Sequence, residues 1–162
     1  MNISLRFRCC GLRSKVEKGL TIMKGSFEVG SVEETWEVAR RLAAELGPGD
    51  VVCLEGDLGA GKTTFVQGLA AAMGVGGRVI SPTFCLVSEH RGGGRLLVHM
   101  DLYRLRGEED VLSVGWEDYL AEGAVIAVEW PDRAGSLIPA NARRVRISAP
   151  SGAGERRTIE IA

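Results

Sequence analysis

The residues best suited to do chemistry form one glycine-rich segment, Gly56-Asp57-Leu58-Gly59-Ala60-Gly61-Lys62-Thr63. It matches the pattern G-x-x-x-x-G-K-[ST], which chance places in a chain of this composition about 0.007 times. The glycines let successive backbone N–H groups point at phosphate oxygens, and the positive end of a following helix adds to that field. Lys62 is then expected to reach the β- and γ-phosphates, and the Thr63 hydroxyl to bind Mg²⁺. The segment therefore predicts a site for a nucleoside triphosphate.

Two acidic residues are candidates for holding the metal and positioning water, which a phosphate-binding loop cannot do alone. Asp101 follows the apolar segment 96–100, and Glu129 follows the apolar segment 124–128. Each would lie at the end of a strand, where ligands bind in open α/β sheets. For either carboxylate alone, a helix cap or a solvated surface group is the alternative. The two together favour a functional role.

Two further candidates are weaker. In Ser81-Pro82-Thr83-Phe84 the proline fixes a turn, and the two hydroxyls could approach the γ-phosphate or its metal. From the residues alone, an ordinary turn is the favoured interpretation. His99 would share a strand face with Asp101, although a strand histidine with satisfied hydrogen bonds is the default.

Strands and helices must bring these residues together, and the sequence predicts both. Ser31 and Glu34 form a capping box that starts a helix ended by residues 47–50. Further helices are expected over 62–73 and 108–120. Strands are expected at 26–29, 51–54, 78–81, 85–89, 95–100, 124–128, 143–148 and 155–161, with a hairpin loop at 90–94. The alternation predicts a three-layer α/β fold around a mixed, partly parallel sheet.

Composition narrows the class of protein. The 162 residues are 45% hydrophobic and 25% charged, which fits one domain able to bury a core. The four cysteines are not spaced like a disulfide framework, so a reducing compartment is the simpler interpretation. The chain contains no apolar stretch of the roughly 18 residues that a membrane span needs. We expect a cytoplasmic protein with no membrane partner.

Residues 1–22 are expected to be an extension outside a folded domain at 23–162. They show neither the period of a strand nor that of a helix, and Met23 stands directly before the first predicted element. A start codon assigned too far upstream is the favoured explanation, with a transit peptide and a genuine basic tail as alternatives. Residues 1–24 carry six basic side chains and one acidic, so the rest of this chain of net charge -1 is acidic.

Four motifs together resemble the TsaE (YjeE) family in order and spacing. They are residues 56–65, 81–84, His99-Met100-Asp101-Leu102-Tyr103-Arg104 and Glu129-Trp130-Pro131. The family is a bacterial P-loop ATPase that helps to make threonylcarbamoyladenosine next to the anticodon of tRNA. The resemblance implies a P-loop NTPase-like fold, ATP and Mg²⁺ as cofactors, and the proteins TsaD and TsaB as partners. It also implies weak hydrolysis in isolation, with tRNA met indirectly through the complex.

The same resemblance implies individual roles. The phosphates would be wrapped by Gly59, Ala60, Gly61, Lys62, Thr63 and Thr64. Thr63 and Glu129 would hold Mg²⁺, and Asp101 would be the Walker B-like carboxylate needed for hydrolysis. The segment 81–84 would be switch-like, with Thr83 near the γ-phosphate, so Lys62, Asp101 and Thr83 are the expected catalytic residues. Trp130 would lie near the nucleotide or a partner, with a core tryptophan as the alternative.

Two other functions would use the same nucleotide site. A small-molecule kinase would need an arginine-bearing lid, for which Arg104 and Arg106 are the nearest candidates. A nucleotide-dependent binding module would hydrolyse ATP only incidentally. Direct tRNA contact is a separate question, since arginines near the C-terminus could touch phosphate but more often serve solvation and edge protection. These are Arg143, Arg144, Arg146, Arg156 and Arg157.

Overall fold

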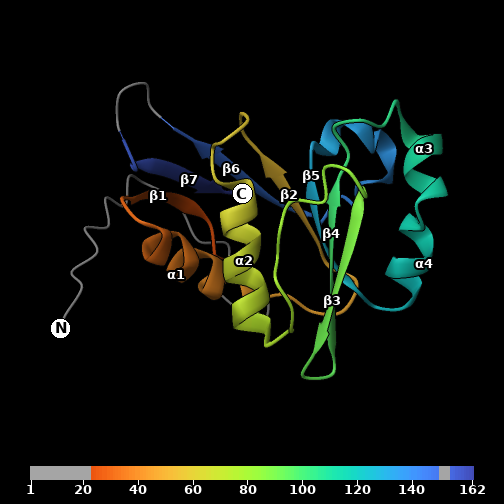
Figure 1. The fold of residues 1–162 in the computed structure, drawn as a ribbon, viewed down its shortest axis with the longest axis horizontal. Helices are drawn as coiled ribbons and strands as arrows, with labels where there is room; N and C mark the ends of the chain where they lie inside the picture. The colour runs from red at the N-terminus through yellow and green to blue at the C-terminus, as the bar shows by residue number, and fades with distance from the viewer. Residues whose placement is uncertain (1–22, 150–153) are drawn as a thin grey trace.

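A seven-stranded sheet forms the middle of the protein, in a computed structural model that describes residues 23–149 and 154–162. The expected extension at 1–22 and most of the expected turn at 150–154 lie outside these residues. Helices α1 (Val32–Ala43) and α2 (Lys62–Met73) pack on one face of the sheet, and α3 (Glu108–Ser113) and α4 (Trp116–Ala121) lie on the other side (Figure 1). The expected three-layer α/β class is confirmed.

The sheet is mixed, with order β1-β7-β6-β2-β5-β4-β3. Its strands are β1 (Gly25–Val29), β2 (Val51–Glu55), β3 (Val87–Gly92), β4 (Arg95–Asp101), β5 (Val125–Glu129), β6 (Arg143–Ser148) and β7 (Arg157–Ile161), and the 3-10 turns η1 (Pro131–Arg133) and η2 (Gly135–Leu137) follow β5. The four central strands β6, β2, β5 and β4 run parallel, while β1, β7 and β3 pair antiparallel. The carboxyl ends of the parallel strands therefore meet at one edge, where Asp101 pairs with Glu129.

Side chains along β4 point alternately toward the two faces of the sheet. Leu97 packs in the core under α1 and α2, whereas Val98 and Met100 pack in the core toward α3 and α4. Because side chains alternate along a strand, His99 and Asp101 lie on the same face as Leu97. Both polar residues therefore face the layer that contains α2.

The segment expected as a strand at 78–81 forms none, and this prediction was wrong. The Gln67 side chain of α2 donates to the Val79 carbonyl at 3.0 Å, so the segment is tied to a helix instead of to a strand. The strand expected at 85–89 begins later, because Leu86 has φ +67° and interrupts the extended backbone. The strand expected at 155–161 likewise begins only at Arg157.

Two other expected boundaries also differ. The loop expected at 90–94 shrinks to Gly93 and Gly94, since His90, Arg91 and Gly92 continue β3 and pair with β4. The helix expected at 108–120 is divided into α3 and α4 at Gly115, whose φ of +90° no helix interior adopts. None of the helices in the described part of the chain is both long and apolar enough to cross a membrane.

Helices α1 and α2 approach each other closely at Gly68. A Cβ placed on Gly68 would lie 2.8 Å from the Ala39 Cβ and 2.9 Å from the Trp36 Cα, so a side chain there would force α1 away. This contact holds the helix that begins at the glycine-rich loop against its neighbour.

We predict that Gly68→Val lowers the free energy of unfolding by about 1–3 kcal/mol, because the added methyl groups overpack the interface between the helices. Urea denaturation measures this change. Ala72→Val, at an exposed position of the same helix, is the control and should cost only about 0.5 kcal/mol through helix propensity. Equal losses in the two variants would contradict the role given to Gly68.

Candidate nucleotide-binding site

The glycine-rich segment forms the loop between β2 and α2, and its geometry needs glycine. Gly56 has φ +147°, and a Cβ there would lie 2.3 Å from the Ile147 carbonyl oxygen of β6. Gly61 caps α2 with φ +111° and offers no side-chain hydrogen bond, whereas Ser31 caps α1 by accepting from the Glu34 amide at 3.2 Å. The first amides of α2 therefore lack a protein cap, and their dipoles favour an anion.

The ammonium group of Lys62 is buried at this loop. Its Nζ donates to the carbonyl oxygens of Gly56 at 2.8 Å and Asp57 at 3.0 Å. It also lies 4.8 Å from the centroid of the Trp130 ring and 4.0 Å from Oε2 of Glu129. Lys62 is thus held beside the loop by uncharged carbonyl oxygens. Charged phosphate oxygens form stronger hydrogen bonds with an ammonium group and could replace them.

Glu129, at the end of β5, is 4% exposed and joins the loop to the sheet. Its Oε1 accepts a hydrogen bond from the Thr63 hydroxyl at 3.2 Å and lies 2.9 Å from Nε2 of His99. The structure therefore brings together the two residues expected to hold Mg²⁺, which are 66 positions apart. It adds His99 as a direct neighbour of the carboxylate.

Asp101, at the end of β4, is also 4% exposed. Its Oδ2 accepts from the Thr83 hydroxyl at 2.8 Å and from the Ser81 hydroxyl at 3.3 Å, while Oδ1 accepts from the Tyr103 amide at 3.1 Å. The switch-like segment is therefore attached to the expected Walker B-like carboxylate. Ser81 enters the site through this carboxylate and through its 2.8 Å contact with Thr83.

One cavity of about 560 Å³ collects nearly all the expected site residues. Its lining comprises Leu58, Gly59, Gly61, Lys62, Thr63, Thr64, Ser81, Thr83, Asp101, Tyr103, Glu129 and Trp130. Ala60 lines instead a neighbouring cavity of about 190 Å³, together with Ser31, Thr35 and Arg157. Both cavities adjoin the loop, and the larger is lined by both carboxylates.

Arg157 and His99 are the site residues whose contacts sequence reasoning missed. Arg157 of β7 donates from Nε to the Ala60 carbonyl at 3.1 Å and so supports the loop from a strand 97 positions away. No local pattern indicates this contact, and from the sequence alone Arg157 is one of the arginines that could touch tRNA phosphate. For His99, the shared strand face with Asp101 was a usable signal, but its partner is Glu129.

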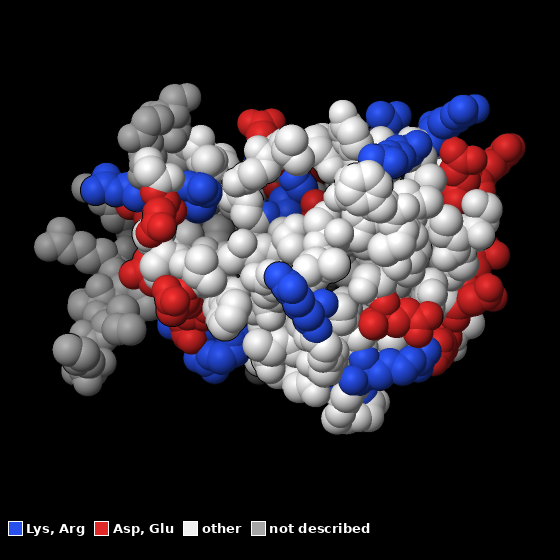
Figure 2. Space-filling view, in the orientation of Figure 1, with Lys and Arg blue, Asp and Glu red and all other residues white. Residues whose placement is uncertain are grey.

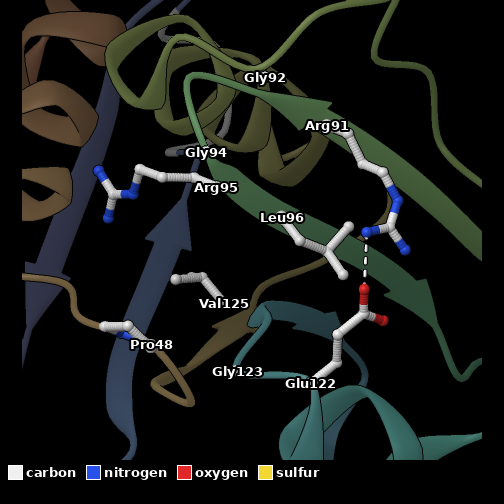
Figure 3. A pocket seen from close by; sticks show the side chains of 9 residues that line it. All are labelled: Pro48, Arg91, Gly92, Gly94, Arg95, Leu96, Glu122, Gly123 and Val125. Carbon is white, nitrogen blue, oxygen red and sulfur yellow. Dashed lines mark hydrogen bonds and ion pairs between the residues drawn. The ribbon is translucent and has the colours of Figure 1, made fainter.

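A second cavity, of about 470 Å³, lies at the amino ends of the parallel strands, away from the loop (Figure 3). Two arginines line this cavity, and both are already paired. The Arg91 guanidinium donates to the Glu122 carboxylate at 2.6 Å, and Arg95 donates to the Leu46 carbonyl at 2.9 Å. Its lining includes no hydroxyl side chain and no helix start that could hold a phosphate. The cavity at the glycine-rich loop is therefore the better candidate for the nucleotide site.

The family model described as threonylcarbamoyl adenosine biosynthesis protein TsaE matches residues 29–159. The chain belongs to the TsaE family. Proteins named tRNA threonylcarbamoyladenosine biosynthesis protein TsaE are 46% identical over 98 residues in Bacillus subtilis (strain 168) and 39% identical over 127 residues in Aquifex aeolicus (strain VF5). The matched segments cover 60% of this chain and 61% of the Bacillus protein, and 72% of this chain and 90% of the Aquifex protein.

A crystal structure of Bacillus subtilis YdiB superposes with a TM-score of 0.70 at 32% identity, over 86% of this chain and 84% of that one. This likeness and the family match confirm the TsaE assignment and the P-loop NTPase-like fold. Membership of a P-loop family indicates nucleotide binding in general. The match to the Bacillus protein spans less than two thirds of its length, so activity and partners are argued separately below.

We predict that ATP binding changes the fluorescence of Trp130, because phosphates would draw Lys62 away from its position 4.8 Å from the ring. A titration with ATP would follow this change in emission. Trp130→Phe should abolish the change, and Trp36→Phe, in α1, should retain it. A full response in Trp130→Phe would show that the ring does not report on the site.

Proposed function

We propose that this protein is a Mg²⁺-dependent ATPase that acts on the TsaD–TsaB complex during synthesis of threonylcarbamoyladenosine on tRNA. The observation that carries the proposal is the convergence of Lys62, Thr63, Thr83, Asp101 and Glu129 on one cavity at the end of an uncapped helix. The pathway comes from the names of the relatives. The partners come from the family resemblance.

The donor chemistry of the cavity fits Mg²⁺. Thr63 and Glu129 offer a hydroxyl and a carboxylate oxygen, the hard ligands that this cation prefers. The described residues contain no cluster of three or more His, Cys, Asp or Glu side chains that could hold a metal alone. The nucleotide phosphates would therefore supply further ligands, and the bound cation would neutralise charge on the β- and γ-phosphates.

The protein's own residues would bind phosphate and position water. Lys62 would exchange its two carbonyl partners for phosphate oxygens, and the loop amides would hold the remaining charge. Asp101 accepts the hydrogen of the Thr83 hydroxyl and Ser81 occupies one lone pair of its oxygen, so the other lone pair could accept a hydrogen of the attacking water. Asp101 would thus act by fixing the orientation of Thr83.

The composition of the cavity supports weak hydrolysis in isolation. No arginine lines it among the described residues, so in that part of the chain Lys62 is the one cationic side chain at the cavity, with no arginine to add to the stabilisation of the transferred phosphoryl. Leu58 and Tyr103, which line the cavity, are 93% and 57% exposed, which leaves its mouth uncovered. A partner that covers this mouth would exclude bulk solvent while retaining the attacking water, and would complete the charge stabilisation.

The kinase alternative finds less support. Arg104 stacks over the Phe84 ring, with its Cζ 4.7 Å from the centroid. Arg106 lines a different hollow together with Glu108, Glu109 and Asp110. Neither arginine belongs to a helix that could close over a phosphoryl group, because residues 102–107 form turns and coil. The binding-module alternative has the same site and is separated only by experiment.

The arginines near the C-terminus support indirect contact with tRNA. Arg143 pairs with Glu45, while Arg144 and Arg146 both pair with Glu55 at 2.9 Å. Partial burial would raise the pKa of Glu55, but the hydrogen bonds from Arg146 and Arg144 hold it below its usual value. Glu45 therefore offsets the charge of Arg143, and Glu55 offsets one of the two charges of Arg144 and Arg146. Acidic side chains gather over α3 and α4, which further disfavours a polyanion there (Figure 2).

We predict that Asp101→Ala still binds ATP and TsaD–TsaB but loses at least about 100-fold in hydrolysis rate, because water near Thr83 is no longer oriented. Phosphate release with and without TsaD–TsaB measures the rate, and modified tRNA is the second readout. Asp118→Ala, an exposed carboxylate of α4, is the control. Normal tRNA modification by Asp101→Ala would favour the binding module with incidental hydrolysis.

We also predict that the isolated protein shows no salt-dependent affinity for tRNA, because its β6 arginines are paired. A tRNA-binding titration at a series of salt concentrations would test this. If affinity fell steeply with salt and Arg144→Ala with Arg146→Ala weakened it, direct contact would replace the indirect one.

A further inference from the structure

His99 is a fully buried polar residue whose role the nucleotide site does not explain. Its side chain is 0% exposed on the α2 face of β4, and Nε2 lies 2.9 Å from Oε1 of Glu129. Its other ring nitrogen, Nδ1, is the one buried side-chain nitrogen or oxygen of the described residues without a hydrogen-bond partner. An apolar side chain would fill this position without leaving an unsatisfied atom. The contact with Glu129 is therefore what requires a histidine.

The contact fixes which nitrogen carries the proton. A carboxylate oxygen only accepts hydrogen bonds, so Nε2 must donate to Glu129. A proton on Nδ1 would be a buried donor with no acceptor. We therefore assign the tautomer with its hydrogen on Nε2.

The two oxygens of Glu129 are consequently unequal. Oε1 accepts from both His99 and Thr63, while no hydrogen bond from the described residues ends on Oε2, which faces the Lys62 ammonium at 4.0 Å. A carboxylate fastened by Thr63 alone could rotate and exchange its two oxygens. The second donor, from the neighbouring strand, holds one arrangement. His99 pairs with Ala127 in register, two residues before Glu129, so the imidazole reaches the carboxylate diagonally across rigid backbone.

We propose that His99 is a positioning residue that locks the Glu129 carboxylate, keeping Oε2 available to the cation that accompanies the nucleotide. This inference rests on the proposed function, in which Glu129 is a Mg²⁺ ligand. Groups that orient a metal ligand change metal affinity about 10- to 100-fold when they are removed. His99 would therefore affect binding of the cation much more than binding of the nucleotide itself.

The test compares the full chain with His99→Leu, which removes the donor, and His99→Gln, whose amide can reach the same oxygen. Mn²⁺ would serve as the probe for the cation, with its binding to the protein–ATP complex followed by electron paramagnetic resonance. ATP affinity in the presence of EDTA is measured in parallel, and thermal unfolding without ligand checks the fold. If His99→Leu does not fold, His99→Asn replaces it, because its amide is too short to reach Glu129.

We expect His99→Leu to weaken Mn²⁺ binding about 10- to 100-fold, with ATP affinity in EDTA changed by less than about twofold, and His99→Gln to recover most of the loss. Unchanged Mn²⁺ affinity in His99→Leu would overturn the inference. So would equal losses of ATP affinity with and without the cation, because a packing defect would produce them. If the unaltered protein bound ATP equally well with and without Mn²⁺, the proposed role of Glu129 would fail first, and the inference with it.

Discussion

The structure depends on one electrostatic constraint: two buried carboxylates lie side by side at the carboxyl ends of neighbouring parallel strands. The parallel register of β4 and β5 pairs Asp101 with Glu129, and each is 4% exposed. Desolvation and mutual repulsion both oppose this arrangement unless each carboxylate finds its own donors. Glu129 takes Thr63 and His99, with Lys62 nearby, and Asp101 takes Thr83, Ser81 and the Tyr103 amide. Loop, helix start and switch-like segment are thus all tied to this edge.

The same constraint explains why distant elements support the loop. The Cβ that Gly56 lacks would collide with the Ile147 carbonyl of β6, and Arg157 of β7 holds the Ala60 carbonyl. Gly68 lets α1 pack closely against α2, the helix whose first residues line the cavity. The loop is therefore fixed from the sheet and from the neighbouring helix before any ligand binds. Such preorganisation lowers the cost of ordering the site when a nucleotide enters.

The sequence predicts the parts of the site that short motifs determine. Lys62 and Thr63 follow from the spacing of the glycines, and Asp101 and Glu129 follow from standing at the ends of apolar segments. Long-range pairing is different, because nothing near His99 indicates a contact with a residue 30 positions away, and Arg157 reaches a loop 97 positions away. The strand wrongly expected at 78–81 had suitable residues, but Gln67 offers its backbone a partner outside the sheet. Local preference gave way to tertiary hydrogen bonding at that position.

The cavity combines buried side chains with an exposed mouth, and this difference bears on how the proposed hydrolysis would be controlled. Lys62, Asp101 and Glu129 are buried in the cavity, whereas Leu58 and Tyr103, which also line it, are exposed. Arg104 lies over Phe84 instead of in the cavity. Nucleotide binding would therefore require little rearrangement of these side chains. Exclusion of bulk solvent from the cavity would require a surface that the described part of the chain does not provide. Apolar exposure at the mouth also means that covering it releases solvent and is favourable in itself. In the proposed function, binding and hydrolysis would thereby be separated, and only hydrolysis would depend on a partner.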